Sequence, residues 1–194
     1  MSPNPQTPKK RLVTFTLDGK QVVAREGATI LNVAMREGVY VPTLCWDERL
    51  EAYGACRACL VGVEGARGPV AACTTPVREG MVVDTRDPVA TRVARNVVEL
   101  VLSDYPKDAL GEKGGEREGE DRNELRRVAA HFGLTESRYE GERHVYARDD
   151  RHPYIKLDLN ECIVCGRCVR ACDEVQGTFA LTYAGRGWAT KIVT

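Results

Sequence analysis

The 194-residue sequence predicts an α+β fold, with a small mixed sheet around one helix, then a helical connector, then a short cysteine-rich segment. Three observations support this prediction. Short alternating strands fill residues 11–86, the hydrophobic period becomes helical from residue 88, and the eight cysteines gather at 45–73 and 162–172. We therefore divide the chain into a tail (1–10), a sheet domain (11–86), a connector (87–152) and a C-terminal segment (153–194).

Composition excludes several classes of function. Lys plus Arg and Asp plus Glu number 28 each, so no net charge attracts nucleic acid or an anionic membrane. The N-terminus lacks the apolar core of a secretory signal, and no apolar run is long enough for a membrane span. We expect a reducing cytoplasm, where clustered thiols bind metal more often than they form disulfides.

The tail and the first hairpin have clear local signals. Residues 1–10 contain three prolines without any periodicity, which predicts disorder. Residues 11–17 alternate apolar and polar side chains and predict a strand. Asp18-Gly19 is a typical hairpin turn, because both residues tolerate positive φ, and residues 21–24 then form the returning strand.

The rest of the sheet domain follows in order. A helix is expected from about residue 29 to 35, ended by Gly38 at the position after its C-cap. A loop over 43–58 contains three cysteines, and strands are expected at 59–63, 69–74 and 81–85. A mixed sheet that grasps one helix is the β-grasp arrangement of a ferredoxin-like domain.

The connector has helical periodicity with a charged interruption. Apolar residues predict a helix from Pro88 to Leu102, and residues 111–127 are mostly charged, as in a solvated loop. A short amphipathic helix follows over 125–132 and ends at Gly133. Residues 154–159 are expected to form a strand that leads to the second group of cysteines.

The first group of cysteines has the spacing C-x10-C-x2-C-x13-C, at Cys45, Cys56, Cys59 and Cys73. A close pair with one outer cysteine on each side is the order of a plant-type [2Fe–2S] site, although the first gap is longer here. Zinc sites usually contain two separated C-x2-C pairs. The spacing therefore favours a [2Fe–2S] cluster over zinc.

The second group has the spacing C-x2-C-x2-C-x3-C, at Cys162, Cys165, Cys168 and Cys172. This is the bacterial ferredoxin run for a [4Fe–4S] cluster, in which the fourth cysteine often binds a second cluster. Either Cys172 completes the same cluster, or it serves another cluster whose remaining ligands are not in this sequence. Gly166 is expected to permit the turn between the cysteines.

The sequence resembles the iron–sulfur region of NAD-dependent formate dehydrogenase α subunits, which is similar to the large iron–sulfur subunit of complex I and to the small diaphorase subunit of NAD-reducing hydrogenases. The motifs that carry the resemblance are Val41–Cys45, Gly54–Cys59, Ala72–Val77, Glu79–Val83 and Cys162–Leu181, with Gly185-Arg186-Gly187. The resemblance implies that Cys45, Cys56, Cys59 and Cys73 hold [2Fe–2S] iron, and that Cys162, Cys165 and Cys168 hold [4Fe–4S] iron.

The chain departs from that family at a middle site. The family usually has a His-x3-Cys-x2-Cys-x5-Cys motif for another [4Fe–4S] cluster. The aligned residues here are Tyr105, Ala109, Glu112 and Glu118. None of these residues is a soft ligand, so we expect the middle cluster to be absent. The family also continues into a second ferredoxin triplet, so we expect a separately encoded or truncated subunit.

The resemblance implies an electron relay between a molybdenum or tungsten formate-oxidising subunit with molybdopterin and a flavin- and NAD-binding diaphorase. The alternatives are a subunit of an NAD-reducing hydrogenase, a complex I-like module, or a zinc-stabilised interaction module. We find no catalytic constellation, no dinucleotide-binding glycine motif, and no metal-ligand spacing among the three histidines. Arg57, Arg167 and Arg170 either stabilise reduced clusters or are ordinary surface residues.

Overall fold

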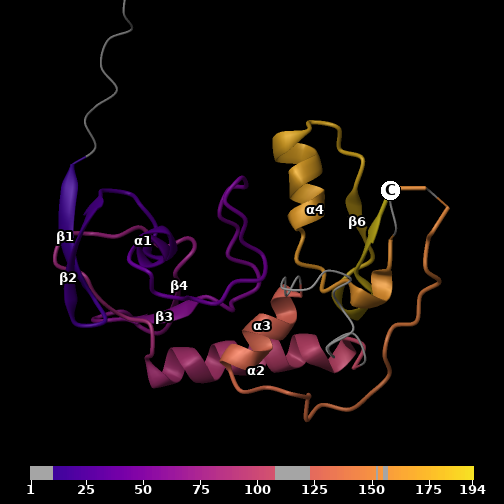
Figure 1. Ribbon diagram of the computed structural model, residues 1–194, viewed down its shortest axis with the longest axis horizontal. Coiled ribbons are helices and arrows are strands. Elements are labelled where there is room, and N and C mark those ends of the chain that lie inside the picture. Colours follow the sequence, from indigo (N-terminus) through magenta and orange to yellow (C-terminus); the bar gives the residue numbers. More distant parts are fainter. Residues whose placement is uncertain (1–10, 108–122, 152, 155–156) are drawn as a thin grey trace, which may run out of the picture. The chain divides into compact units, whose positions relative to one another are not determined.

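The structure is a computed structural model that describes residues 11–107, 123–151, 153–154 and 157–194 (Figure 1). Its contacts divide the chain into two compact units, one formed by residues 1–41 and 59–92 and the other by residues 42–58 and 93–194. The predicted tail 1–10 lies outside the described residues. Strands and helices occur in both units, which confirms the α+β class.

The first unit contains a five-stranded mixed sheet in the order β2-β1-β5-β3-β4. Its strands are β1 (Leu12–Leu17), β2 (Lys20–Arg25), β3 (Leu60–Val63), β4 (Val70–Ala71) and β5 (Val82–Asp84). β1 pairs antiparallel with β2 and parallel with β5, and β3 pairs antiparallel with both β4 and β5. Alternation along β1 places three apolar side chains in the core: Val13, Phe15 and Leu17.

Helix α1 (Ile30–Arg36) packs in the same unit and completes the β-grasp arrangement. The Thr29 hydroxyl accepts a hydrogen bond from the Asn32 amide at 3.2 Å, which caps the helix N-terminus. At the other end Gly38 has φ +72°, and the Val39 amide donates to the Ala34 carbonyl at 2.8 Å. This Schellman motif confirms the glycine predicted after the C-cap.

The predicted strand over 69–74 is shorter than expected. Only Val70–Ala71 pairs with β3, and residues 72–74 form a turn. The Ala71 carbonyl accepts the amides of Thr74 and Thr75 at 3.2 and 3.1 Å, and the Thr75 hydroxyl at 2.8 Å. These local bonds replace the ladder bonds that a longer strand would make, so Cys73 lies in a turn.

The second unit has its core between α2 (Pro88–Asp104), which enters this unit at Val93, and α3 (Glu124–His131). Asn123 caps α3 by accepting the Arg126 amide at 3.0 Å, and its side chain donates to the Tyr105 hydroxyl at 3.0 Å. The buried cluster of this unit consists of Leu44, Ala58, Val98, Leu102, Tyr105, Leu125, Val128, Ala129 and Leu134.

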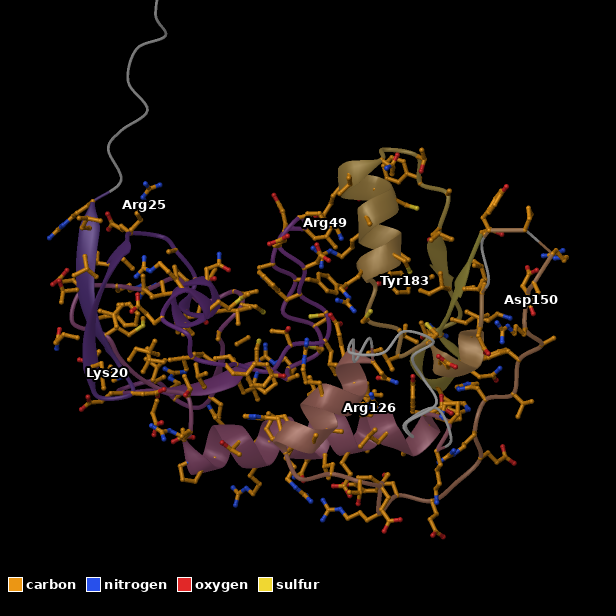
Figure 2. The ribbon with its side chains drawn as sticks, viewed as in Figure 1. Lys20, Arg25, Arg49, Arg126, Asp150 and Tyr183 are labelled. Carbon is orange, nitrogen blue, oxygen red and sulfur yellow. The ribbon has the colours of Figure 1, made fainter. Side chains whose placement is uncertain are left out.

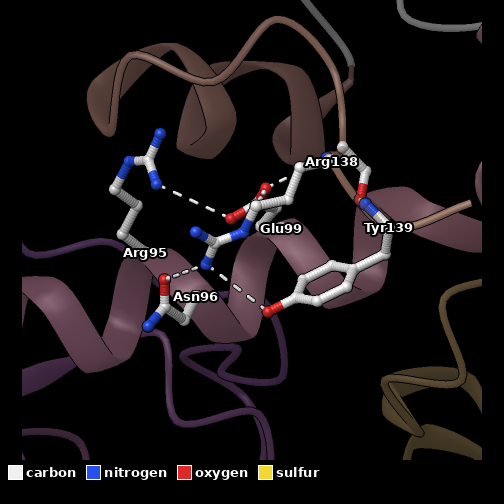
Figure 3. A network of polar contacts seen from close by, with 6 residues as sticks. Arg95, Asn96, Glu99, Arg138 and Tyr139 are labelled. Carbon is white, nitrogen blue, oxygen red and sulfur yellow. Dashed lines mark hydrogen bonds and ion pairs between the residues drawn. The ribbon is translucent and has the colours of Figure 1, made fainter.

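One carboxylate is buried on α2 (Figure 3). Glu99 is 2% exposed, and its Oε1 accepts the Arg138 amide at 3.0 Å. Two guanidinium groups surround it, with Arg138 Nε at 3.2 Å and Arg95 Nη1 at 3.6 Å. Arg138 also donates to the Asn96 side chain at 3.1 Å. These bonds attach the segment after α3 to α2.

The C-terminal part of the second unit consists of short elements. They are η3 (Leu159–Glu161), α4 (Arg167–Arg170), the π-helical turn η4 (Ala171–Val175), β6 (Thr182–Ala184), η5 (Gly187–Ala189) and β7 (Lys191–Val193). β6 and β7 form an antiparallel pair in which Tyr183 lies opposite Ile192. The described helices include none that is long and apolar enough to cross a membrane.

The strand predicted over 154–159 is wrong for the residues that the structure describes. Leu157 makes a single bridge with Asp149, and Leu159 already begins the 3-10 turn η3. Asp158 caps that turn, because its carboxylate accepts the Asn160 amide at 3.0 Å. A short polar side chain that bonds its own backbone favours a turn over a strand. Residues 155–156 lie outside the described part.

Candidate metal centres

All eight cysteines lie in the described part of the chain, and no disulfide joins them. Each of the two units contributes cysteines to the first group, because the division between the units falls between Ala58 and Cys59. In the described residues, no three or more His, Cys, Asp or Glu side chains are arranged to hold a single metal ion.

The loop over 43–58 carries Cys45 and Cys56. Leu44 and Ala58 anchor the two ends of this loop in the core of the second unit. Near its end the backbone turns through left-handed conformations at Gly54 (φ +69°) and Arg57 (φ +56°). The turn directs the Cys56 amide at Cys45 Sγ, 3.4 Å away. Backbone N–H groups that face sulfur are typical of iron–sulfur sites.

The side chains of Cys45 and Cys56 interact through a hydrogen bond. A hydrogen bond from the Cys45 side chain lowers the pKa of Cys56. The same hydrogen bond, followed by burial, raises the pKa of Cys45. Two sulfur donors this close together suit a cation, since a bound metal favours both thiolates.

In the first unit, Cys59 and Cys73 adjoin the β3–β4 pair. The Ala72 amide donates to the Cys59 carbonyl at 2.9 Å, which continues the pairing of Leu60 with Ala71. Both cysteines are 1% exposed. The Leu31 amide of α1 donates to the Ala72 carbonyl at 2.9 Å, so helix and strand together fix the backbone beside Cys73.

The second group lies on the turn before α4, on α4 itself and on the following turn η4. The Val164 amide donates to Cys162 Sγ at 3.4 Å. Val164 has φ +52°, which is unusual for a β-branched residue, and Gly166 follows with φ +77°. Two of the three residues from Val164 to Gly166 thus have left-handed backbone conformations, which curve the chain around the cysteine side chains. The predicted role of Gly166 in the turn is confirmed.

Cys162, Cys165 and Cys168 are close enough to influence one another electrostatically. Burial raises the pKa of Cys162, and the charges of Cys165 and Cys168 raise it further. Burial likewise raises the pKa of Cys168, with smaller contributions from Cys165 and Cys172. Three thiolates in one partly buried place are unfavourable alone, and a bound cationic cluster would relieve their repulsion.

Tyr183, which is labelled in Figure 2, belongs to β6 and lies against Gly166 in this turn. A Cβ atom added at Gly166 would overlap the Tyr183 hydroxyl oxygen and lie 3.2 Å from its Cζ. Burial raises the pKa of the Tyr183 phenol, followed by Tyr53 and then by the charges of Cys165 and Cys168. The phenol therefore lies directly against the cysteine turn, a contact that no local sequence signal predicts.

The three arginines singled out in the sequence differ in their surroundings. Arg57 is exposed. Arg167 pairs with Glu124 at the start of α3. Arg170 is largely buried and bonds to the loop that carries Cys45. Its ion pair with Glu174, four residues later, is the spacing at which helical side chains meet, and that spacing was visible in the sequence.

The middle site is described at only one of its four aligned positions. Tyr105 is 6% exposed, belongs to the core of the second unit and bonds to Asn123. The other three positions, Ala109, Glu112 and Glu118, lie outside the described residues. The absence of the middle cluster therefore stays a prediction.

Of the three histidines, His144 lines a cavity in the second unit. Its Nδ1 lies 2.6 Å from Asp104 Oδ2, and its ring stacks on Trp188 with centroids 4.1 Å apart. These side chains line a cavity of about 330 Å³ that also reaches Cys162. Burial lowers the pKa of His131, and His152 lies outside the described residues.

Both groups of cysteines fit iron–sulfur clusters on chemical grounds. Each group supplies only soft thiol donors, and in each a backbone N–H points at a cysteine sulfur. In the second group the thiolates would repel one another, which favours a cationic partner.

Comparison with known proteins agrees with this chemistry. Residues 10–88 match the family described as 2Fe-2S iron-sulfur cluster binding domain. Residues 152–194 match the NADH-quinone oxidoreductase subunit 3, ferredoxin-like domain. The chain accordingly binds a [2Fe–2S] and a [4Fe–4S] cluster.

Curated relatives include the NADP-reducing hydrogenase subunit HndD of Solidesulfovibrio fructosivorans, 38% identical over 93% of this chain and 31% of its own length. The mitochondrial NADH-ubiquinone oxidoreductase 78 kDa subunit of Neurospora crassa is 35% identical over 94% of this chain and 24% of its own length. The chain spans about a fifth to a third of the curated relatives that it matches.

A solved structure supports the same relationship. A chain in the crystal structure of NAD⁺-reducing [NiFe]-hydrogenase in the H₂-reduced state is 32% identical. The match covers 93% of this chain and 74% of that chain with a TM-score of 0.77. The protein therefore belongs to the family of iron–sulfur subunits that NADH-quinone oxidoreductases and NAD(P)-reducing hydrogenases share.

Proposed function

We propose that the chain is an electron-transfer subunit of an NAD(P)-linked oxidoreductase complex. The observation that carries this proposal is the presence of two separate groups of cysteine ligands, each with a backbone N–H directed at sulfur. Iron–sulfur clusters supply one-electron transfer, and the protein binds them, spaces them and sets their potentials. No hydrolytic or acyl-transfer constellation is needed for this role.

The proposed ligands follow the sequence motifs. Cys45, Cys56, Cys59 and Cys73 hold the [2Fe–2S] cluster, and Cys162, Cys165 and Cys168 hold three corners of the [4Fe–4S] cluster. The fourth corner belongs either to Cys172, on the π-helical turn η4, or to a cysteine from outside this sequence. The proximity of Cys165 and Cys168 to Cys162 supports the second set.

For the partner, we propose a formate dehydrogenase in which the electrons come from a molybdopterin-containing subunit and pass to a flavin- and NAD-binding diaphorase. The support is the run Cys162–Leu181 with Gly185-Arg186-Gly187, which resembles that family most. A hydrogenase diaphorase or a complex I-like module fits as well, because the hydrogenase and NADH-oxidoreductase relatives cover nearly the whole chain.

The substrate of the native complex distinguishes these proposals. The complex is purified anaerobically, and its clusters are followed by EPR after addition of formate, hydrogen or NADH. Reduction of the clusters by formate supports the formate dehydrogenase assignment. Reduction by hydrogen but not by formate supports a hydrogenase instead. Zinc in place of iron and acid-labile sulfide would contradict the electron-transfer function and support an interaction module.

A further inference from the structure

The loop over 43–58 is held at its middle by two side chains of the second cysteine motif. No residue from Pro42 to Cys59 lies in a helix or a strand, so the loop needs other contacts to keep one conformation. Leu44 and Ala58 fix only its ends. The middle of the loop bonds to Arg170 and Glu174, which belong to the same compact unit.

Arg170 contacts the loop with both terminal nitrogens and with the face of its guanidinium group. Nη1 donates to the Cys45 carbonyl at 3.4 Å, and Nη2 donates to the Glu51 carbonyl. The group also lies over the Tyr53 ring, 5.2 Å from its centroid. Only a forked, planar cation reaches several acceptors and an aromatic face together, so lysine is not equivalent here.

Glu174 completes the contact at the same residue, Glu51. Its Oε1 accepts from Arg170 Nε at 2.9 Å, and its Oε2 accepts the Glu51 amide at 2.7 Å. The Arg170–Glu174 ion pair therefore binds both the N–H and the carbonyl of Glu51. The hydrogen bond from the Glu51 amide is the first cause of the lowered pKa of Glu174, followed by Arg170.

The position of Arg170 connects the two cysteine groups. It lies between Cys168 and Cys172 in the sequence, at the end of α4. Its side chain is only 11% exposed, and a cation that has lost this much water needs its partners. The helix that carries the second cysteine group is thereby bonded to the segment that carries Cys45.

We propose that Arg170, together with Glu174, is a positioning residue that fixes the Cys45 loop against α4 and so sets the electronic coupling between the two clusters. The effect on electronic coupling rests on the proposed electron-transfer function. The positioning role depends on protein contacts alone and does not require bound iron.

The test compares four variants in anaerobically prepared, cluster-loaded protein. Arg170→Leu removes the guanidinium group, and Arg170→Lys keeps the positive charge without its planar shape. Glu174→Gln keeps the shape of the Glu174 side chain and removes its charge. Arg49→Leu is the control, because Arg49 lies in the same loop, is 75% exposed and bonds to nearby Asp47. Two readouts are taken: hydrogen exchange of the Glu51 amide, and the relaxation enhancement that the reduced [4Fe–4S] cluster imposes on the [2Fe–2S] EPR signal.

We expect Glu51 exchange to accelerate about tenfold or more in both Arg170 variants, because both lose the guanidinium group that orients the Glu174 acceptor and binds the Glu51 carbonyl. Glu174→Gln should show a smaller acceleration, and Arg49→Leu none. The relaxation enhancement should change in both Arg170 variants but not in the control, since a residue that serves only folding would leave it unaltered.

Other results overturn the proposal. Wild-type behaviour of Arg170→Lys in both readouts would show that charge alone matters. Faster exchange without any change in relaxation would reduce Arg170 to a structural residue. Absence of iron and sulfide from the wild-type protein would instead refute the proposed function, and Glu51 exchange in that same protein would still test the positioning role.

Discussion

Gly166 provides the sharpest test of the local geometry at the second cysteine group. Its φ of +77° costs an alanine about 1–2 kcal/mol, because a Cβ is crowded in the left-handed region. The new Cβ would also overlap the Tyr183 hydroxyl, and the repacking adds about 1–3 kcal/mol. Gly166→Ala should therefore destabilise the protein by about 2–5 kcal/mol.

The two contributions separate in a double-mutant cycle. Tyr183→Phe removes the overlapping oxygen, so that the nearest remaining atom, Cζ, lies 3.2 Å from the added Cβ. The double variant should therefore keep the backbone cost of about 1–2 kcal/mol and the smaller cost of the close contact with Cζ. Tyr183→Phe alone should cost about 1 kcal/mol or less.

The assay is urea unfolding of reconstituted protein in a Trp46→Phe background, where Trp188 is the only remaining tryptophan and reports on the C-terminal segment. Iron content is measured on the same samples. If Gly166→Ala and the double variant are equally unstable, the Tyr183 contact is not the source of the cost, and the described packing of β6 against the cysteine turn is wrong.

Three further predictions concern other parts of the chain. Glu99→Gln should lower the free energy of unfolding by about 1–3 kcal/mol in urea titrations, because it weakens the bonds of a buried carboxylate to arginine; an unchanged value would contradict this. The hydrogen bonds from Arg151 should hold the pKa of Asp149 at about 2 in an NMR titration. Because this pKa is lowered, the stabilisation is present above the ordinary value of 3.8 and is lost as pH falls through 2. Arg151→Ala should raise the pKa only part of the way to that value, because the amide of residue 151 still donates to Asp149. Cys73→Ser should remove the [2Fe–2S] EPR signal and leave the [4Fe–4S] signal, and loss of both signals would show that the two sites are not independent.

Local signals in the sequence were sufficient for much of the fold. The alternation before Asp18-Gly19 predicted the first hairpin, and Gly38 predicted the end of α1, since both depend on neighbouring residues alone. The cysteine spacings likewise predicted both cluster types. The turn and cap signals lie within a few residues, and the cysteine spacings can be read directly from the sequence.

The remaining features depend on residues that are distant in the sequence. Arg170 meets the Glu51 carbonyl 119 residues away, and no periodicity marks that contact. Tyr183 lies against Gly166 although it belongs to β6, a strand that pairs with β7. The strand predicted over 154–159 failed because Asp158 caps a turn, a side-chain effect that competes with strand propensity. The predicted domain limits and ligand assignments stay predictions.

The central claim is that this chain carries two iron–sulfur clusters of different kinds. The most direct measurement is the iron and acid-labile sulfide content of anaerobically purified protein, combined with low-temperature EPR after reduction. We expect about six iron atoms per chain, with one [2Fe–2S] and one [4Fe–4S] signal. About ten iron atoms would show that the middle cluster is present, and zinc without iron or sulfide would contradict the claim.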